Sequence, residues 1–170
     1  MKLIVDTNVP VVANGASASP QAGPKCVRSC VSKVREIQLQ HILILDDGWH
    51  IVREYMRNLA SSGQPGVGDA FLKWVLTNRA NPQRCEIVHI TPRNGGSDPI
   101  TFLEFPDDDA LIGFDRSDHK FLAASISHPE RPPILNAVDS DWWDYRVALE
   151  RHGVRVEFLC PETMTADHSS

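Results

Sequence analysis

Acidic residues that follow apolar segments are the side chains in this sequence whose types and positions most clearly suggest chemistry. Asp6 comes directly after the apolar run 2–5, and Asp139 directly after the run 134–138. Carboxylates are ligands that Mg²⁺ and Mn²⁺ favour, whereas zinc prefers nitrogen and sulfur. No serine, cysteine or histidine set has a signature of nucleophilic catalysis, and Gly95-Gly96 lacks the Lys-Ser/Thr pattern of a phosphate-binding loop. The sequence therefore favours a metal site built from carboxylates.

Several of these acids also have a purely structural interpretation. Asp6-Thr7-Asn8 can open a turn through hydrogen bonds to the local backbone. Glu54 lies off the apolar stripe of its predicted helix, where solvent-exposed glutamates are common. We interpret Asp46-Asp47 as turn residues and the acidic run 107–109 as a solvated helix start. Neither of these two groups is expected to bind metal.

Asp118 differs because it lies three and four residues before the apolar pair Phe121-Leu122 and so shares their buried face. A buried acid needs partners, and a bound cation is one candidate. The alternative is a favourable charge on the first helical turn, near the free amides. Asp115 is a rival for the same role.

Two acids follow the apolar run 134–138 before the next predicted helix, and either one can serve as its N-cap. We take Asp139 as the metal ligand. Asp141 is then the cap or a second ligand.

The elements that must position these acids alternate along the chain. Apolar patterns predict strands at 2–5, 41–45, 86–90, 134–138 and 154–159, and helices at 24–39, 49–60, 69–78, 107–112, 117–127 and 141–152. Such alternation predicts a three-layer α/β/α domain with a parallel sheet and right-handed crossovers. Sites in these sheets form at the carboxyl ends of the strands, so Asp6 and Asp139 are expected over the same edge.

Length and composition fit one domain. The chain has 170 residues, of which 42% are hydrophobic, and we predict a domain over 1–160 followed by a disordered tail at 161–170. The net charge of −5 argues against a general polyanion-binding surface, although bound divalent cations would reverse the field at a carboxylate cluster. No apolar run could span a membrane and no signal peptide is visible, so we expect a cytoplasmic protein without membrane contact.

The four cysteines form neither a C-x-x-C pair nor a zinc-knuckle spacing, although Cys26 and Cys30 sit one helical turn apart. The other two are Cys85 and Cys160. We predict that all four are reduced, partly buried thiols.

Four segments, taken in order, resemble the PIN-domain ribonucleases over nearly the whole chain. They are Leu3-Ile4-Val5-Asp6-Thr7-Asn8-Val9, Glu54 on the helix after the second strand, Asp118-His119-Lys120-Phe121-Leu122-Ala123-Ala124, and Asp139-Ser140-Asp141-Trp142. Two features depart from the family pattern. Ala137-Val138 stands where members often carry a hydroxyl residue, and the Pro/Gly-rich segment 91–106, which could form a flap, is longer than in compact members.

The resemblance implies a five-stranded parallel sheet with strand order 3-2-1-4-5 and a site between strands one and four. It implies one or two Mg²⁺ or Mn²⁺ ions on Asp6, Glu54, Asp118 and Asp139, with Asp141 as a further ligand and Asn8 in support. The implied activity is metal-dependent endoribonuclease cleavage of RNA phosphodiester bonds.

Many PIN proteins resemble toxins of toxin–antitoxin pairs, so the resemblance also implies a homodimer and an antitoxin protein as partner. Two alternatives remain open. One is a catalytically silent PIN-like module that binds RNA or protein, and the other is a nuclease directed at DNA, because nothing identified in the sequence recognises the RNA 2′-hydroxyl.

Overall fold

The computed structural model describes residues 1–93 and 98–166. It has a single parallel sheet with strand order β3-β2-β1-β4-β5. The strands are β1 (Lys2–Val5), β2 (Ile42–Asp46), β3 (Cys85–Val88), β4 (Ile134–Asn136) and β5 (Val156–Phe158). The predicted fold class and strand order are therefore confirmed.

Strand β1 lies at the centre of the sheet because it is short, apolar and covered on both faces. Leu3, Ile4 and Val5 are almost completely buried, as expected of a strand in a two-sided parallel sheet. In register, Leu3 pairs with Leu43 of β2, and Val5 pairs with Leu135 of β4. The chain order therefore reverses on either side of β1, and the carboxyl ends of β1 and β4 lie side by side.

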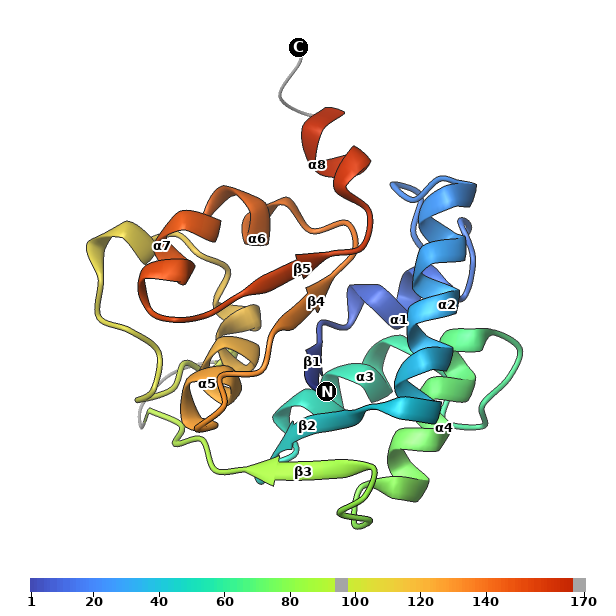
Figure 1. The fold of residues 1–170 in the computed structure, drawn as a ribbon, viewed down its shortest axis with the longest axis horizontal. Coiled ribbons are helices and arrows are strands. Elements are labelled where there is room, and N and C mark those ends of the chain that lie inside the picture. Colours follow the sequence, from blue (N-terminus) through green and yellow to red (C-terminus); the bar gives the residue numbers. More distant parts are fainter. Residues whose placement is uncertain (94–97, 167–170) are drawn as a thin grey trace.

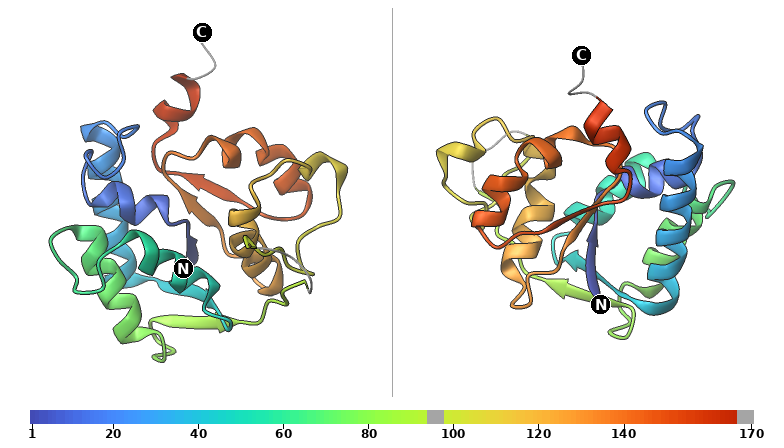
Figure 2. Two further views of the ribbon diagram at one scale, coloured as in Figure 1. Left: turned by 180° about the vertical axis from the view of Figure 1, so that it is seen from behind. Right: turned by 45° about the horizontal axis from the view of Figure 1, so that its top comes forward.

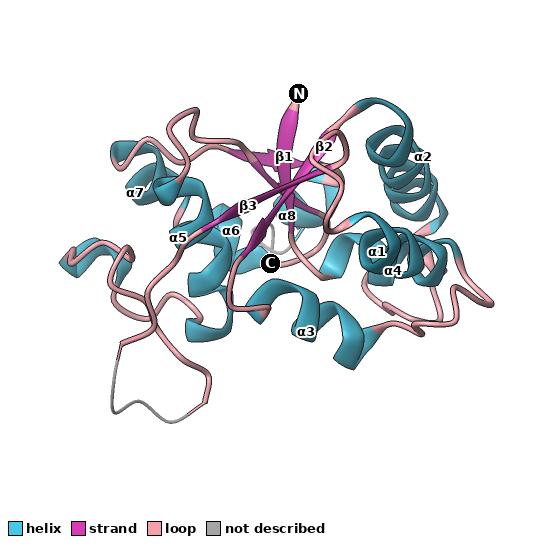
Figure 3. Cartoon of the chain, turned by 90° about the horizontal axis from the view of Figure 1, so that it is seen from below, coloured by secondary structure: helices cyan, strands magenta, loops and turns pink. Residues whose placement is uncertain are grey.

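Helices cover both faces of the sheet (Figures 1, 2 and 3). They are α1 (Asn8–Ala13), α2 (Pro24–Gln40), α3 (His50–Asn58), α4 (Val67–Asn78), α5 (His119–Ser127), α6 (Ser140–Asp144), α7 (Arg146–Arg151) and α8 (Pro161–Ala166), with the 3₁₀ turns η1 (Asp109–Leu111) and η2 (Arg116–Asp118). In Figure 3, α1, α2 and α4 gather on one side of the sheet, and α5, α6 and α7 on the other.

Helix α2 shows how the sequence pattern fixes a helix and its buried face. Pro24 occupies the first turn, where its missing N–H costs nothing, and the buried side chains recur at helical spacing. These buried residues are Cys26, Cys30, Val34 and Ile37. Both cysteines of this helix therefore face inward.

The sequence patterns missed helix α1, predicted one helix that is too long, and merged two others. Asn8–Ala13 begins a helix directly after Asp6-Thr7, because the chain turns at the end of β1 and buries Val9 and Val12. A β-branched hexamer containing Pro10 gives little helical signal. The predicted helix at 107–112 is only the turn η1, and the helix at 141–152 is divided into α6 and α7 at Tyr145.

Helices α1 and α4 cross so closely that Gly68 has no room for a side chain. A Cβ atom built on Gly68 would lie 1.8 Å from the carbonyl oxygen of Pro10. Asn14, just after α1, exchanges hydrogen bonds with Asp69 on α4, at 3.1 Å and 3.0 Å. This crossing fixes α1, and with it the residues that follow β1.

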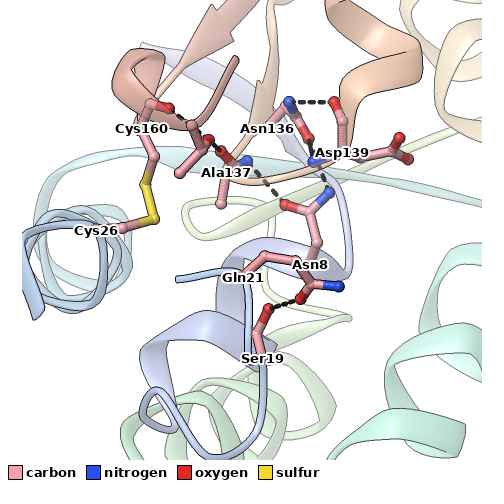
Figure 4. Close-up of a disulfide and its surroundings, with 9 residues drawn as sticks. Asn8, Ser19, Gln21, Cys26, Asn136, Ala137, Asp139 and Cys160 are labelled. Carbon is pink, nitrogen blue, oxygen red and sulfur yellow. Dashed lines mark hydrogen bonds between the residues drawn. A yellow bond between two sulfur atoms is a disulfide. The ribbon is translucent and has the colours of Figure 1, made fainter. Parts of the chain in front are cut away.

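The C-terminal region differs from the prediction. Residues 161–166 form helix α8 rather than a disordered tail, and Met164 of this helix is 2% exposed. The predicted tail residues 167–170 lie outside the described residues. The helix is held because Cys160, just before it, forms a disulfide with Cys26 of α2 (Figure 4).

The prediction of four reduced thiols is therefore wrong for Cys26 and Cys160. Spacing could not reveal this pair, because it joins residues that are 134 positions apart. Cys30 and Cys85 are free and buried, as predicted. Burial raises the pKa of Cys30 to about 12 and that of Cys85 to about 11, so both remain protonated thiols at neutral pH.

The segment 91–106 is anchored to the domain at its base. Pro92 and Phe102 form an antiparallel bridge, and Phe102 is 1% exposed. Residues 94–97 of the predicted flap 91–106 lie outside the described residues. Within the described part of the chain, no helix is long and apolar enough to cross a membrane.

Candidate metal centre

Three carboxylates from distant parts of the sequence meet at the carboxyl ends of β1 and β4. Asp6 follows β1, Asp139 lies just beyond β4, and Asp118 ends the turn η2 before α5. One oxygen from each of these side chains lies within 4.8 Å of the other two. The predicted meeting of Asp6 and Asp139 is confirmed, and Asp118 joins them. We refer to these three residues as the acid cluster.

Asp6 is buried, and donors hold both of its carboxylate oxygens. The backbone N–H of Asn8 donates to Oδ1 at 2.9 Å, and the indole Nε1 of Trp142 donates to Oδ2 at 2.7 Å. Asp6 is 4% exposed, so its orientation depends on these two donors. Each oxygen still has lone pairs for another partner.

Asp118 occupies the N-cap position of α5 but makes no capping hydrogen bond. Its side chain is buried, and Oδ2 has no hydrogen-bond partner among the described residues. Leaving a carboxylate oxygen buried and unpaired is costly. Asp118 therefore makes no capping hydrogen bond to the free amides of the first turn of α5, and a cation at the acid cluster would supply the missing partner.

The electrostatics of the cluster also favour a cation. Burial, followed by the charges of Asp6, Asp139 and Glu54, raises the pKa of Asp118 to about 10. Burial is the largest cause for Asp6 too, and Glu54 and Asp139 add to it, raising its pKa to about 7 against the opposing effect of the Asn8 and Trp142 donors. At neutral pH and without a cation, Asp118 therefore holds a proton and Asp6 is partly protonated.

Asp139 is both a helix cap and a member of the acid cluster, two roles that were alternatives in the sequence analysis. It is the N-cap of α6, because its Oδ1 accepts the backbone N–H of Asp141 at 2.9 Å, and it also belongs to the acid cluster. The expectation that Asp141 is the cap is therefore wrong. Asp141 lies outside the cluster, and its Oδ2 accepts the backbone N–H of Asp115 at 3.2 Å.

Glu54 lies next to the acid cluster but is engaged by other groups. Its Oε1 accepts Lys120 Nζ at 2.8 Å, and its Oε2 accepts the hydroxyl of Thr7. Tyr55, the next residue of α3, donates its hydroxyl to the carbonyl of Val5 at 2.5 Å, which fixes this helix against the end of β1. Glu54 therefore borders the cluster, although it is not one of the three converging carboxylates.

Asn8 connects the end of β1 to the loop that carries Asp139 (Figure 4). Its Nδ2 donates to Asn136 Oδ1 at 2.8 Å, and its Oδ1 accepts the backbone N–H of Ala137 at 2.8 Å. Asn136 in turn donates its Nδ2 to the carbonyl of Asp139 at 3.0 Å. These contacts fit the supporting role that the resemblance implied for Asn8.

Sequence reasoning missed Trp142, Asn136 and the burial of Lys120. Trp142 is completely buried in spite of its place beside two acids, and its indole N–H is the only signal that it could serve a carboxylate. Lys120 is only 9% exposed because it pairs with Glu54. Periodicity alone cannot identify a lysine that is buried by its charge partner.

The acids that were predicted to be structural have structural roles. Asp46 accepts the backbone N–H groups of His50 and Ile51 at the start of α3, and Asp108 accepts that of Ala110 at the start of η1. Neither belongs to the acid cluster.

A cavity of about 460 Å³ opens beside Glu54 and Lys120. Its basic lining consists of His50, Arg53, Arg57 and Lys120, and the base of the 91–106 segment closes one side through Phe102. Arg116 lines a different cavity. Three cationic side chains, Arg53, Arg57 and Lys120, therefore line this cavity together with the acidic Glu54 and Asp98.

Comparisons of this chain with protein families, curated proteins and solved structures find no match.

Proposed function

We propose that this protein is a nuclease that depends on Mg²⁺ or Mn²⁺ and cleaves RNA phosphodiester bonds at the acid cluster. The observation that carries the proposal is the meeting of Asp6, Asp118 and Asp139 around one point, with the buried Oδ2 of Asp118 lacking a partner among the described residues. Oxygen ligands of this kind suit Mg²⁺ and Mn²⁺. The resemblance to PIN-domain ribonucleases points to the same chemistry.

The residues of the acid cluster and those around it would have different roles in metal binding. Asp6, Asp118 and Asp139 would hold one or two ions, and we propose Glu54 and Asp141 as further ligands. When bound, such ions activate water and offset charge on the attacked phosphate and the leaving oxygen. Trp142 and Asn8 orient Asp6 through the two hydrogen bonds at 2.7 Å and 2.9 Å.

Substrate binding would use the basic cavity beside Glu54. Arg53 and Arg57 present guanidinium groups suited to phosphate oxygens, and Lys120 lines the same cavity while binding Glu54, which borders the acid cluster. A short stretch of single-stranded RNA could then pass from the cavity across the carboxylates.

The biological setting follows from the resemblance alone. We propose a toxin-like ribonuclease that acts as a homodimer in the cytoplasm and is inhibited by an antitoxin protein. The disulfide between Cys26 and Cys160 is unusual for that compartment. A neighbouring short gene for a DNA-binding protein would support the toxin role.

The test is cleavage of labelled RNA and DNA by the pure protein with Mn²⁺, with Mg²⁺ or with a chelator. Metal-dependent RNA cleavage that disappears in folded Asp6→Asn would support the proposal, and a preference for DNA would contradict its substrate. No cleavage by a folded protein that still binds RNA would favour the catalytically silent module. That outcome has structural grounds, because Asp139 also caps a helix and Lys120 neutralises Glu54.

A further inference from the structure

Three cysteines meet where the start of α2 lies against the segment leading into α8. Cys26 and Cys30 lie one turn apart on α2, and Cys160 precedes α8. One sulfur from each lies within 4.8 Å of the other two, and all three residues are 0% exposed. We refer to them as the sulfur cluster. A disulfide uses only Cys26 and Cys160, so its formation does not explain a third thiol at the same point.

We propose that reduction of the Cys26–Cys160 bond converts the sulfur cluster into a three-thiolate binding site for Cu⁺. This site is separate from the acid cluster, and the proposal does not depend on the nuclease function.

The geometry of the cluster suits a metal ion. Metal–thiolate bonds are about 2.3 Å long, so three sulfurs arranged around one ion are separated by about 4 Å. The sulfurs of Cys26, Cys30 and Cys160 already lie within 4.8 Å of one another. Once the sulfur–sulfur bond is broken, small side-chain rotations are enough to place all three around a common centre.

The ligand set favours Cu⁺ over Zn²⁺. Thiolates are soft ligands that select both ions, but structural zinc is almost always four-coordinate. Within the described residues, no histidine, aspartate, glutamate or fourth cysteine joins this group, and its complete burial excludes water as the fourth ligand. Cu⁺ is satisfied by three thiolates in a plane, which is what this site offers.

The conversion is chemically balanced with a dithiol as the reductant. The dithiol gives two electrons and two protons, the bond between Cys26 and Cys160 breaks to two thiols, and the reductant closes its own disulfide. Binding of Cu⁺ to Cys26, Cys30 and Cys160 then releases three protons, with no change in the oxidation state of the metal. Reduction also removes the covalent link between α2 and α8, which allows local opening for entry of the ion.

The experiment compares oxidised and reduced protein under anaerobic conditions. The protein is treated with dithiothreitol, desalted, and titrated with Cu⁺ as its acetonitrile complex in the presence of a chromophoric Cu⁺ chelator. We expect the reduced protein to retain one Cu⁺ per chain, with a thiolate-to-copper absorption band, and the oxidised protein to retain none. Folding of each form is followed by the near-ultraviolet circular dichroism of its tryptophans.

Cys30→Ser is the decisive variant because it removes the third sulfur and keeps the two disulfide partners. Loss of a direct ligand should weaken Cu⁺ binding by more than about 100-fold, since even groups that only orient ligands change affinity 10–100-fold. Cys85→Ser is the matched control, because Cys85 is also a buried free thiol but lies outside the cluster. It should bind Cu⁺ as the wild type does. If Cys30→Ser does not fold, Cys30→Ala takes its place.

Three results would overturn the proposal. One is the absence of retained Cu⁺ in folded, reduced protein, and another is equal Cu⁺ affinity in wild type and the folded Cys30 variant. Tighter retention of Zn²⁺ than of Cu⁺ would refute the choice of ion. If reduction unfolds the chain, recovery of the folded signal on addition of Cu⁺ supports the site, and failure to recover it counts against the site.

Discussion

The acid cluster and the sulfur cluster are both groups of three potential ligands, yet they differ in how the fold supports them. Asp6 is fixed by hydrogen bonds from Trp142 and Asn8, and Oδ2 of the neighbouring Asp118 has no hydrogen-bond partner among the described residues. Among the described residues, no hydrogen-bond donor holds the sulfurs of the sulfur cluster, which is closed by a covalent bond between two of its members. Hard ligands are therefore held ready for a cation, whereas soft ligands are held in a form that must first be reduced.

The largest expected difference between the two clusters is in their contribution to the free energy of unfolding. Reducing the disulfide should lower the free energy of unfolding by about 4 kcal/mol, because the closed loop is long and its chain entropy is restored in the unfolded state. The measurement is urea unfolding with and without dithiothreitol. Cys160→Ser should show the same loss and no further response to the reductant, while a reductant effect that persists in this variant would contradict the explanation.

The next effect is on activity. Asp118→Asn should reduce metal-dependent cleavage by about 100-fold or more, because it removes one of the three converging carboxylates, and groups that stabilise charge at a reacting centre have effects of this size. Stability without metal should change little at neutral pH, because Asp118 is already protonated there and asparagine is a neutral side chain of similar size.

Asp115→Asn is the matched control for that variant. Asp115 is an exposed acid that caps η2 by accepting the backbone N–H of Ser117 at 2.9 Å, and asparagine caps equally well. Activity close to that of the wild type is expected in steady-state cleavage assays. Similar losses in both variants would mean that the acid cluster has no special role.

A smaller effect is expected at Asn8, which connects β1 to the loop before Asp139. Asn8→Ala removes hydrogen bonds to Asn136 and Ala137, each 2.8 Å long, and should lower the free energy of unfolding by about 1–3 kcal/mol. Mn²⁺ binding, measured by electron paramagnetic resonance, should weaken. Cu⁺ binding by the reduced protein should not change, and a parallel loss of both would show that the two clusters are coupled.

The smallest effect concerns pH. Asp6 has a pKa of about 7 in the folded protein against its ordinary 3.8, so its contribution to stability without metal is full below pH 3.8 and is lost as the pH rises through about 7. A bound cation removes this penalty by displacing the proton. The stabilisation given by saturating Mn²⁺ should therefore increase as the pH rises near neutrality. For each proton that the ion displaces, the increase is about 1.4 kcal/mol per pH unit.

Thermal unfolding with and without Mn²⁺, at about pH 6 and about pH 7, measures this difference. Asp6→Asn, which cannot titrate, is the control and should show less pH dependence. Stabilisation by Mn²⁺ that is constant over this range would argue against proton displacement at the cluster.

The features that could be predicted from the sequence are those that depend on residues close together in the chain. Continuous apolar runs gave the five strands of the sheet, and an acid placed directly after a strand gave Asp6 and Asp139, because strand ends in a parallel sheet share an edge. Asp118 could be inferred from its place on the buried face of α5. These inferences need only the positions of residues within one element.

The features that escaped prediction depend on partners far away in the sequence. The pairing of Cys26 with Cys160 depends on the fold that brings the segment after β5 against α2, and the burial of Lys120 follows from its contact with Glu54 on another helix. The same is true of Trp142, whose indole meets Asp6 only after β1 and β4 have paired. No local pattern of residues encodes such encounters.

The disulfide also divides the chain topologically. The ring closed by Cys26 and Cys160 contains β2 to β5 together with Glu54, Asp118 and Asp139, whereas β1 and Asp6 belong to the free N-terminal arm. This arm supplies the central strand of the sheet, between β2 and β4. In the oxidised protein, the acid cluster therefore combines carboxylates from inside a covalently closed ring with one from an arm that is joined to this ring at a single end.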